Sequence, residues 1–252
     1  MKKLHLFFIF SQVALMILLN ACAEDPVSPT TVADVDGNTY HTIMIGTQVW
    51  MVENLRTSHY RNGDVIPNIT DNSAWANLST GARCNYNNDA TNGTKYGHLY
   101  NFFAIADSRN IAPVGWHVPT DAEWKTLIDY VSTHLGTSLS ETKALAATTD
   151  WRAYSEPWSV GCNLTLNNST GFSALPCGSR KGYGGAFNGL GGNTYWWSST
   201  QDNSSFAQYG RVTAWYRFMQ YNYPGVFSIY NLDDDANGYG RQQGFSVRCI
   251  KD

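Results

Sequence analysis

The stretch GWHVPTDAEW, residues 115–124, contains a histidine, an aspartate and a glutamate within seven residues. Thr120 and Glu123 have the T-x-x-E spacing of a capping box, in which both side chains accept hydrogen bonds from backbone N–H groups at a helix start. The apolar residues that follow recur at helical spacing, which predicts an amphipathic helix. They are Trp124, Leu127, Ile128 and Val131. We therefore interpret this stretch as the entry to a helix.

The same stretch also has the residue types of an acid–base site or a metal site. The capping box already accounts for Glu123, and Asp121 in the first turn favours the helix dipole. His117 has no partner acid that the sequence identifies. The structural interpretation is therefore preferred to a catalytic one, and we expect Trp116 and Trp124 to anchor the core.

On the N-terminal side of this helix, Asp36-Gly37-Asn38 and Gly46-Thr47 are turn signals, which predict a small antiparallel meander near residues 32–53. Residues 56–95 are polar and rich in Asn, Thr and Gly, so we expect a long irregular segment. The spacing of apolar residues predicts a short buried helix within residues 96–107. Another short helix is expected within residues 140–148, with Ser140 as its cap.

After residue 150 the pattern changes to short strands and Gly-rich loops. The expected strands are YWWSST, SFAQYGRVTAWYRFMQY, GVFSIYN and GFSVRCI. These features predict an α+β fold in which two or three helices pack on twisted antiparallel sheets with long Gly-rich loops.

The N-terminus has the features of a secretory signal: two lysines followed by an apolar run that ends in LNAC, residues 19–22. LNAC resembles a bacterial lipobox, which would make Cys22 the lipidated first residue of the mature protein; the alternative is an ordinary signal peptide cut nearby. We divide the chain into a lipoprotein signal peptide (1–21), a flexible tether (22–31) and a single domain (32–252). The expected location is the bacterial outer membrane or cell surface.

Without Cys22 four cysteines remain, an even number that suggests two disulfides in an exported protein. Three connectivities are possible. We favour Cys162–Cys177, which closes a short loop, and Cys84–Cys249, which ties an early loop to the expected last strand. There is no C-x-x-C pair or Cys/His cluster, so a structural zinc site is not expected.

Composition limits the partners. Charged residues make up 15% of the chain and the formal net charge is −3, so the basic surface that nucleic-acid binding requires is missing. Aromatic residues reach 14%, and aromatic faces beside polar groups suit sugar rings or peptides. The candidate ligand contacts are Trp196, Trp197, Trp215 and Tyr183. Strand alternation directs Trp196 and Trp197 to opposite faces, so we expect at least one in the core and at most one displayed as a ligand contact.

Residues 233–238, DDDANG, begin like a calcium loop, with Asp233, Asp235 and Asn237 as alternating oxygen ligands. The twelfth position of such a loop is Gly244 here, where a bidentate glutamate is required. A solvated acidic loop is the alternative. We expect no resident cofactor apart from this possible Ca²⁺.

Seven motifs, in order, closely resemble the Fibrobacter succinogenes major paralogous domain family over residues 34–252. They are DVDGNTY, IGTQVWMVENL, YGHLYNFFA, PVGWHVPTDAEW, GFSALPCGSR, YWWSST and GFSVRCIKD. The resemblance implies an exported, often lipid-anchored bacterial protein and supplies no catalytic residues. The P-T-x-x-E-W helix start, the Trp-rich strand and the G-F-x-x-R strand are also similar to the formylglycine-generating-enzyme group, which implies a C-type-lectin-like fold. Fold similarity alone does not transfer function.

Together these features favour a non-enzymatic surface module that binds a glycan or a surface protein, with membrane contact through the lipid anchor alone. One alternative is an enzyme of the formylglycine-generating type, which needs a closely spaced pair of thiols to hold copper. The spacing of Cys162, Cys177 and Cys249 does not match that pair. The other alternative is a structural subunit of a surface assembly.

Overall fold

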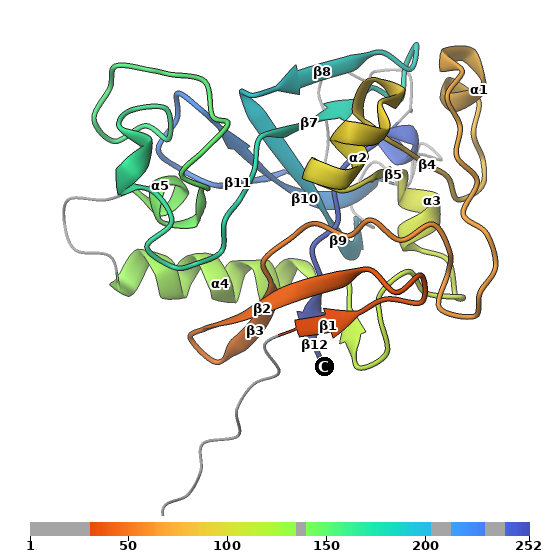
Figure 1. Ribbon diagram of the computed structural model, residues 1–252, viewed down its shortest axis with the longest axis horizontal. Coiled ribbons are helices and arrows are strands. Elements are labelled where there is room, and N and C mark those ends of the chain that lie inside the picture. Colours follow the sequence, from red (N-terminus) through yellow and green to blue (C-terminus); the bar gives the residue numbers. More distant parts are fainter. Residues whose placement is uncertain (1–30, 135–139, 203–212, 230–239) are drawn as a thin grey trace, which may run out of the picture.

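The structure contains two five-stranded sheets, one of which includes β1, β2, β3 and β12 at the lower edge of the view in Figure 1. The computed structural model describes residues 31–134, 140–202, 213–229 and 240–252. The first sheet has the order β1-β2-β3-β12-β6 and is antiparallel throughout. Its strands are β1 (Thr31–Ala33), β2 (Thr39–Ile45), β3 (Gln48–Met51), β6 (Trp116–His117) and β12 (Ile250–Lys251).

The second sheet has the order β11-β10-β9-β7-β8. Strands β7 and β9 are parallel, while the other neighbours are antiparallel, so this sheet is mixed. Its strands are β7 (Cys177–Arg180), β8 (Phe187–Leu190), β9 (Asn193–Asp202), β10 (Thr213–Gln220) and β11 (Phe227–Ile229). A separate two-stranded pair consists of β4 (Arg83–Cys84) and β5 (Leu99–Tyr100).

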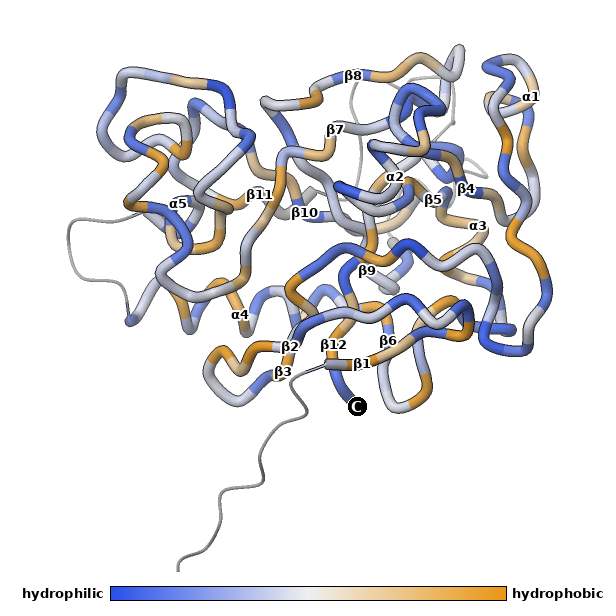
Figure 2. Tube along the Cα trace, viewed as in Figure 1, coloured by the Kyte–Doolittle hydropathy of each residue, from blue (hydrophilic) through white to orange (hydrophobic). Residues whose placement is uncertain are grey.

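Within the described residues there are five α-helices, of which α4 (Asp121–His134) is the longest. Its residues Trp124, Leu127 and Val131 are buried, and Figure 2 shows apolar and polar residues alternating along it. The others are α1 (Asn72–Ala76), α2 (Ala90–Tyr96), α3 (Phe102–Ile105) and α5 (Glu141–Leu145), with the 3₁₀ turns η1 (Tyr86–Asn88), η2 (Leu164–Leu166) and η4 (Gly240–Gln242).

Strand β9 is buried on both faces because a hydrophobic cluster lies on each side of it. Trp197 packs in the cluster that contains Phe102, Trp116 and Phe245. Trp196 packs in the cluster that contains Trp50, Trp124 and Phe172. The indole ring centroids of Trp124 lie 4.7 Å from Trp50 and 5.7 Å from Trp196. The helix entry and the Trp-rich strand therefore meet in one aromatic core.

Residues 244–251 connect the two sheets. Ser246 bridges to Trp196 of β9, and Ile250 pairs with both Trp50 of β3 and His117 of β6. Between these points the backbone N–H groups of Leu55 and Met51 donate to carbonyls of residues 247 and 249. This single segment thus links elements that are far apart in the sequence.

Several local predictions are confirmed. The turn at residues 36–38 joins β1 to β2, with Gly37 at a φ of 79°, and Gly46 at 63° joins β2 to β3. Helix α4 begins at Asp121, and the Ser140 side chain accepts from Lys143 N at the start of α5. The α+β class is confirmed as well.

Other predictions need correction. Residues 56–95 are not wholly irregular, because they contain α1, β4, η1 and α2, and the helices are more numerous than the two or three expected. The helix expected within residues 96–107 is reduced to β5 and the four-residue α3, because Asn101 caps a new start by accepting from Ala104 N. The expected strand GFSVRCI forms mostly single bridges and ends in the short β12. No helix among the described residues is long and apolar enough to cross a membrane.

Candidate functional site

The capping box predicted for residues 120–123 is present. Thr120 N donates to Glu123 Oε2 at 2.8 Å, and Glu123 N donates to Thr120 Oγ1 at 3.2 Å. Asp121 does more than favour the helix dipole, since its Oδ1 accepts from the buried Arg217 Nη1 at 2.6 Å. Trp116 and Trp124 are both buried, as expected for core anchors.

The interpretation that His117 lacks a partner acid is wrong. Its Nε2 lies 2.8 Å from Glu123 Oε1, and its Nδ1 lies 2.7 Å from Asp252 Oδ1. The second acid is distant in sequence, and the pairing of β6 with β12 brings it to the histidine. Burial lowers the pKa of His117, but the hydrogen bonds to Asp252 and Glu123 outweigh burial, so the net pKa is raised.

This raised pKa predicts a pH dependence of stability. A histidine whose folded pKa exceeds its unfolded value of about 6.5 stabilises the fold fully below that value and loses this contribution as pH rises through the folded pKa. The free energy of unfolding should therefore fall as pH rises above about 6.5. Urea unfolding at a series of pH values measures it. His117→Gln should flatten the slope, Asp252→Asn should give an intermediate slope, and an unchanged slope in His117→Gln would contradict this assignment.

The two tryptophans proposed as ligand contacts are not displayed. Trp196 and Trp197 are only 1% and 2% exposed, so both lie in the core and neither is displayed to a ligand. The indole N–H of Trp196 donates to Asn54 Oδ1 at 2.9 Å, and that of Trp197 donates to the carbonyl of Tyr100 at 2.8 Å. Alternation does place them on opposite faces of β9, but both faces are covered. Tyr183 is 64% exposed and Trp215 is half-buried at an irregularity of β10, so these two stay candidates.

The two expected disulfides are not formed. Free thiols are present at all four positions, Cys84, Cys162, Cys177 and Cys249. Cys84 and Cys249 belong to different hydrophobic clusters. Cys177 instead contacts Asn54 Nδ2 at 3.0 Å and donates to the carbonyl of Leu175. Burial raises the pKa values of Cys84, Cys177 and Cys249. These three thiols are therefore buried, and burial favours their protonated form.

Two predicted sites cannot be placed. Cys22 and the calcium candidates Asp233, Asp235 and Asn237 lie outside the described residues. Within the described part of the chain, no group of three or more His, Cys, Asp or Glu side chains is arranged to hold a metal ion.

A polar cavity of about 300 Å³ lies where β3 ends, beside α2 and the loops that follow α5 and η2. Ten of its fourteen lining residues carry polar side chains. They are Glu53, Asn54, Arg56, Thr94, Lys95, Tyr96, Thr148, Thr149, Asn168 and Ser173; the others are Val52, Gly97, Ala147 and Leu175. The volume is at the lower end of the range of about 300–1,000 Å³ that ligand pockets occupy.

Two charged side chains in the cavity wall are already engaged. Both oxygens of Glu53 contact His41, at 2.7 Å from its backbone N and 2.7 Å from its Nδ1. Lys95 forms an ion pair with Asp150, which raises the pKa of Lys95. Asp150 therefore neutralises Lys95, while Glu53 accepts from a neighbouring strand of the first sheet.

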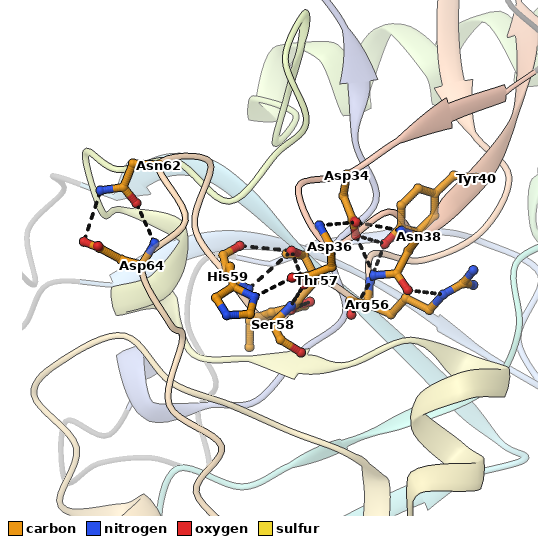
Figure 3. Close-up of polar contacts among 11 residues, drawn as sticks. Asp34, Asp36, Asn38, Tyr40, Arg56, Thr57, Ser58, His59, Asn62 and Asp64 are labelled. Carbon is orange, nitrogen blue, oxygen red and sulfur yellow. Dashed lines mark hydrogen bonds and ion pairs between the residues drawn. The ribbon is translucent and has the colours of Figure 1, made fainter.

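A network of polar contacts around the turn between β1 and β2 holds Arg56, the third charged residue of the wall (Figure 3). Its Nε donates to Asn38 Oδ1 at 3.3 Å and its Nη2 donates to the carbonyl of Thr39 at 3.2 Å. Asp34 fixes Asn38 and Tyr40 by accepting from the Asn38 side chain at 2.8 Å and from Tyr40 Oη at 2.6 Å. The turn predicted at residues 36–38 thus also positions a guanidinium group.

Asp36 attaches this turn to the segment that follows Arg56. Its carboxylate accepts from Thr57 Oγ1 at 3.0 Å and from Ser58 N, and it contacts His59 Nδ1 (Figure 3). Burial raises the pKa of Asp36, but these hydrogen bonds outweigh burial, so the net pKa is lowered. These contacts therefore connect the turn at residues 36–38 to residues 57–59.

Asn54 forms the floor of the cavity and is nearly buried, at 5% exposure. Its Nδ2 donates to the carbonyl of Tyr96 at 2.9 Å and to Cys177 Sγ at 3.0 Å. Its Oδ1 accepts from Trp196 Nε1 at 2.9 Å and from Arg248 Nη2 and Nε at 3.0 and 3.2 Å. The side-chain amide of Asn54 thus takes part in five hydrogen bonds, which hold the floor of the cavity in place.

Arg248 lies beneath this floor and is 1% exposed. Its other acceptor is the carbonyl of Phe172, and no carboxylate among the described residues lies within ion-pair distance of it. Burial lowers its pKa to about 10, so it carries its charge at neutral pH. The sequence does contain signals for these buried polar residues. Arg248 interrupts the apolar run FSVRCI, and Glu53-Asn54 directly follows the apolar run VWMV.

The comparison with known proteins identifies the family. A family model described as the Fibrobacter succinogenes major domain matches residues 43–251. The chain belongs to this family. No curated protein and no solved structure matched the chain in the same comparisons.

Five of the stretches that resemble the Fibrobacter succinogenes major domain lie at the cavity or beneath its floor. WMVENL supplies Glu53 and Asn54, YGHLYNFFA begins at Tyr96, and GFSALPCGSR supplies Ser173. YWWSST and GFSVRCIKD contribute Trp196 and Arg248 beneath the floor. These stretches are separated in sequence but adjacent in space, and we therefore take the cavity as the candidate site.

Proposed function

We propose that this Fibrobacter succinogenes major domain protein is an exported, lipid-anchored surface module that binds a glycan in the polar cavity, without catalysis. The observation that carries the proposal is the floor itself, where Asn54 joins five hydrogen bonds below a wall of polar side chains. A fixed polar cavity suits a ligand whose hydroxyl groups need donors and acceptors in set positions.

A C-type-lectin-like fold is part of this proposal. In its support, β1, β2 and β3 share one sheet with β12, and long loops flank the second sheet. The lipobox at Cys22 and the tether at residues 22–31 support attachment to the outer membrane or cell surface. Calcium at Asp233, Asp235 and Asn237 is proposed as an accessory ion for the same function.

The enzyme alternative draws less support. Copper chemistry of the formylglycine-generating type requires thiolates, and burial raises the pKa values of Cys177 and Cys249, which favours the protonated thiols. The structural-subunit alternative requires a partner that pairs with an exposed strand, and it is addressed by the experiment below.

The proposal is tested on a glycan array with the purified protein, with and without calcium. Thr148 is exposed at the cavity rim, so Thr148→Trp should fill the cavity and weaken glycan binding at least about tenfold without disturbing the fold. Thr126→Trp, on the exposed face of α4, is the matched control and should bind as the wild type does. Equal binding by both variants, or an empty array with a protein partner recovered by pull-down, would overturn the cavity as a glycan site.

A further inference from the structure

Arg56 differs from the other charged residues of the cavity wall because all of its acceptors are uncharged. The backbone N and Nδ1 of His41 engage Glu53, and Asp150 engages Lys95. The Arg56 side chain donates to the amide of Asn38 and to a backbone carbonyl, and its guanidinium group lies 5.2 Å from the Tyr40 ring centroid. No described residue accepts a hydrogen bond from its Nη1, and Arg56 is one of the residues that line the cavity.

Arg248 adds a second unmatched cation below the floor. It contacts Asn54, which lines the cavity, and its acceptors are likewise uncharged. Three cationic groups, Arg56, Lys95 and Arg248, lie in and around the cavity. Asp150 pairs with Lys95, while Arg56 and Arg248 have no carboxylate within ion-pair distance among the described residues, and Asp34 contacts the Asn38 to which Arg56 donates. A buried charge is poorly screened, so its potential extends into the space above it.

We infer that the cavity selects sugars that carry a carboxylate, such as uronic acids, with Arg56 as the group that receives the carboxylate. This inference rests on the proposed function and names its ligand class. A guanidinium group matches a carboxylate in a planar, bidentate geometry that an ammonium group cannot reproduce.

A sugar acid fits better than an acidic peptide because of the residues around Arg56. Thr148, Thr149 and Ser173 bring hydroxyl groups to the same cavity, and Asn168 brings an amide. Such groups can exchange hydrogen bonds with the hydroxyls of a sugar ring, which both donate and accept, whereas the ionised side chains of an acidic peptide only accept.

The experiment compares an oligogalacturonide with its methyl ester by isothermal titration of the full protein, since esterification removes the charge and keeps the skeleton. At low salt the acid should bind at least about tenfold more tightly than the ester, and the difference should shrink as salt rises. Arg56→Gln should abolish the preference, and Arg56→Lys should retain part of it. Arg109→Gln removes a surface arginine that does not line the cavity and should keep the full preference.

Each outcome decides a different point. Equal binding of acid and ester by the wild type would overturn the carboxylate inference and leave the glycan-binding cavity standing. A preference that persists in Arg56→Gln, with its thermal unfolding unchanged, would remove Arg56 from the inference. Binding of an oligoglutamate peptide but of neither sugar would overturn both this inference and the proposed function.

Discussion

Replacing Asn54 with alanine should lower the free energy of unfolding by about 3–5 kcal/mol. The variant leaves the guanidinium group of Arg248 buried with a single remaining carbonyl acceptor, and it also removes the acceptor of the Trp196 indole N–H. A buried charge that loses its partner is among the costliest single changes in a core. Urea unfolding of the purified variant measures the loss.

Asn62→Ala is the matched control, because it removes the same side chain from an exposed loop where its amide contacts only Asp64. Its effect should stay within about 0.5 kcal/mol. If Asn54→Ala were no more destabilising than this control, the floor of the cavity would not be the fixed element that the proposed binding site requires.

Replacing Asp121 with alanine should lower the free energy of unfolding by about 3 kcal/mol. Asp121 pairs through Oδ1 with Arg217 Nη1 at 2.6 Å, and the Arg217 side chain is 2% exposed whereas that of Asp121 is 29% exposed. The substitution removes the carboxylate that pairs with the buried guanidinium group of Arg217. Arg217 Nη2 can still donate to the backbone carbonyl of residue 121. The substitution also removes an acid from the first turn of α4.

A double-mutant cycle separates the stranded charge from the other effects. Adding Arg217→Met to Asp121→Ala should recover part of the lost stability, because the uncompensated cation is then absent. Asp129→Ala is the control, since its ion pair with Lys125 is exposed on the same helix and should contribute less than about 0.5 kcal/mol. A double variant less stable than Asp121→Ala alone would contradict the buried-charge explanation.

Features set by neighbouring residues were accessible from the sequence. The capping box of Thr120 and Glu123, the cap at Ser140 and the turn at Asp36-Gly37-Asn38 each involve residues within a few positions of one another. Local backbone geometry and local hydrogen bonds decide such features, so the pattern suffices.

Features that join distant segments were not accessible in this way. Asp252 reaches His117 only because β12 pairs with β6, and Asp121 reaches Arg217 only because α4 lies against β10. The burial of both Trp196 and Trp197 likewise depends on clusters that cover both faces of β9. Strand alternation predicts opposite faces, but it does not reveal whether each face meets solvent.

The cavity floor has a consequence for the order in which the molecule is assembled. Asn54 and Arg248 are 194 positions apart, and β12 within residues 244–251 pairs with both β3 and β6. Contacts of such long range form slowly and late in folding. Until residues 244–251 are in place, Asn54 lacks the two hydrogen bonds from Arg248, so ligand binding should arise in the final, cooperative step. Binding competence would then report complete folding of the whole domain rather than of any part of it.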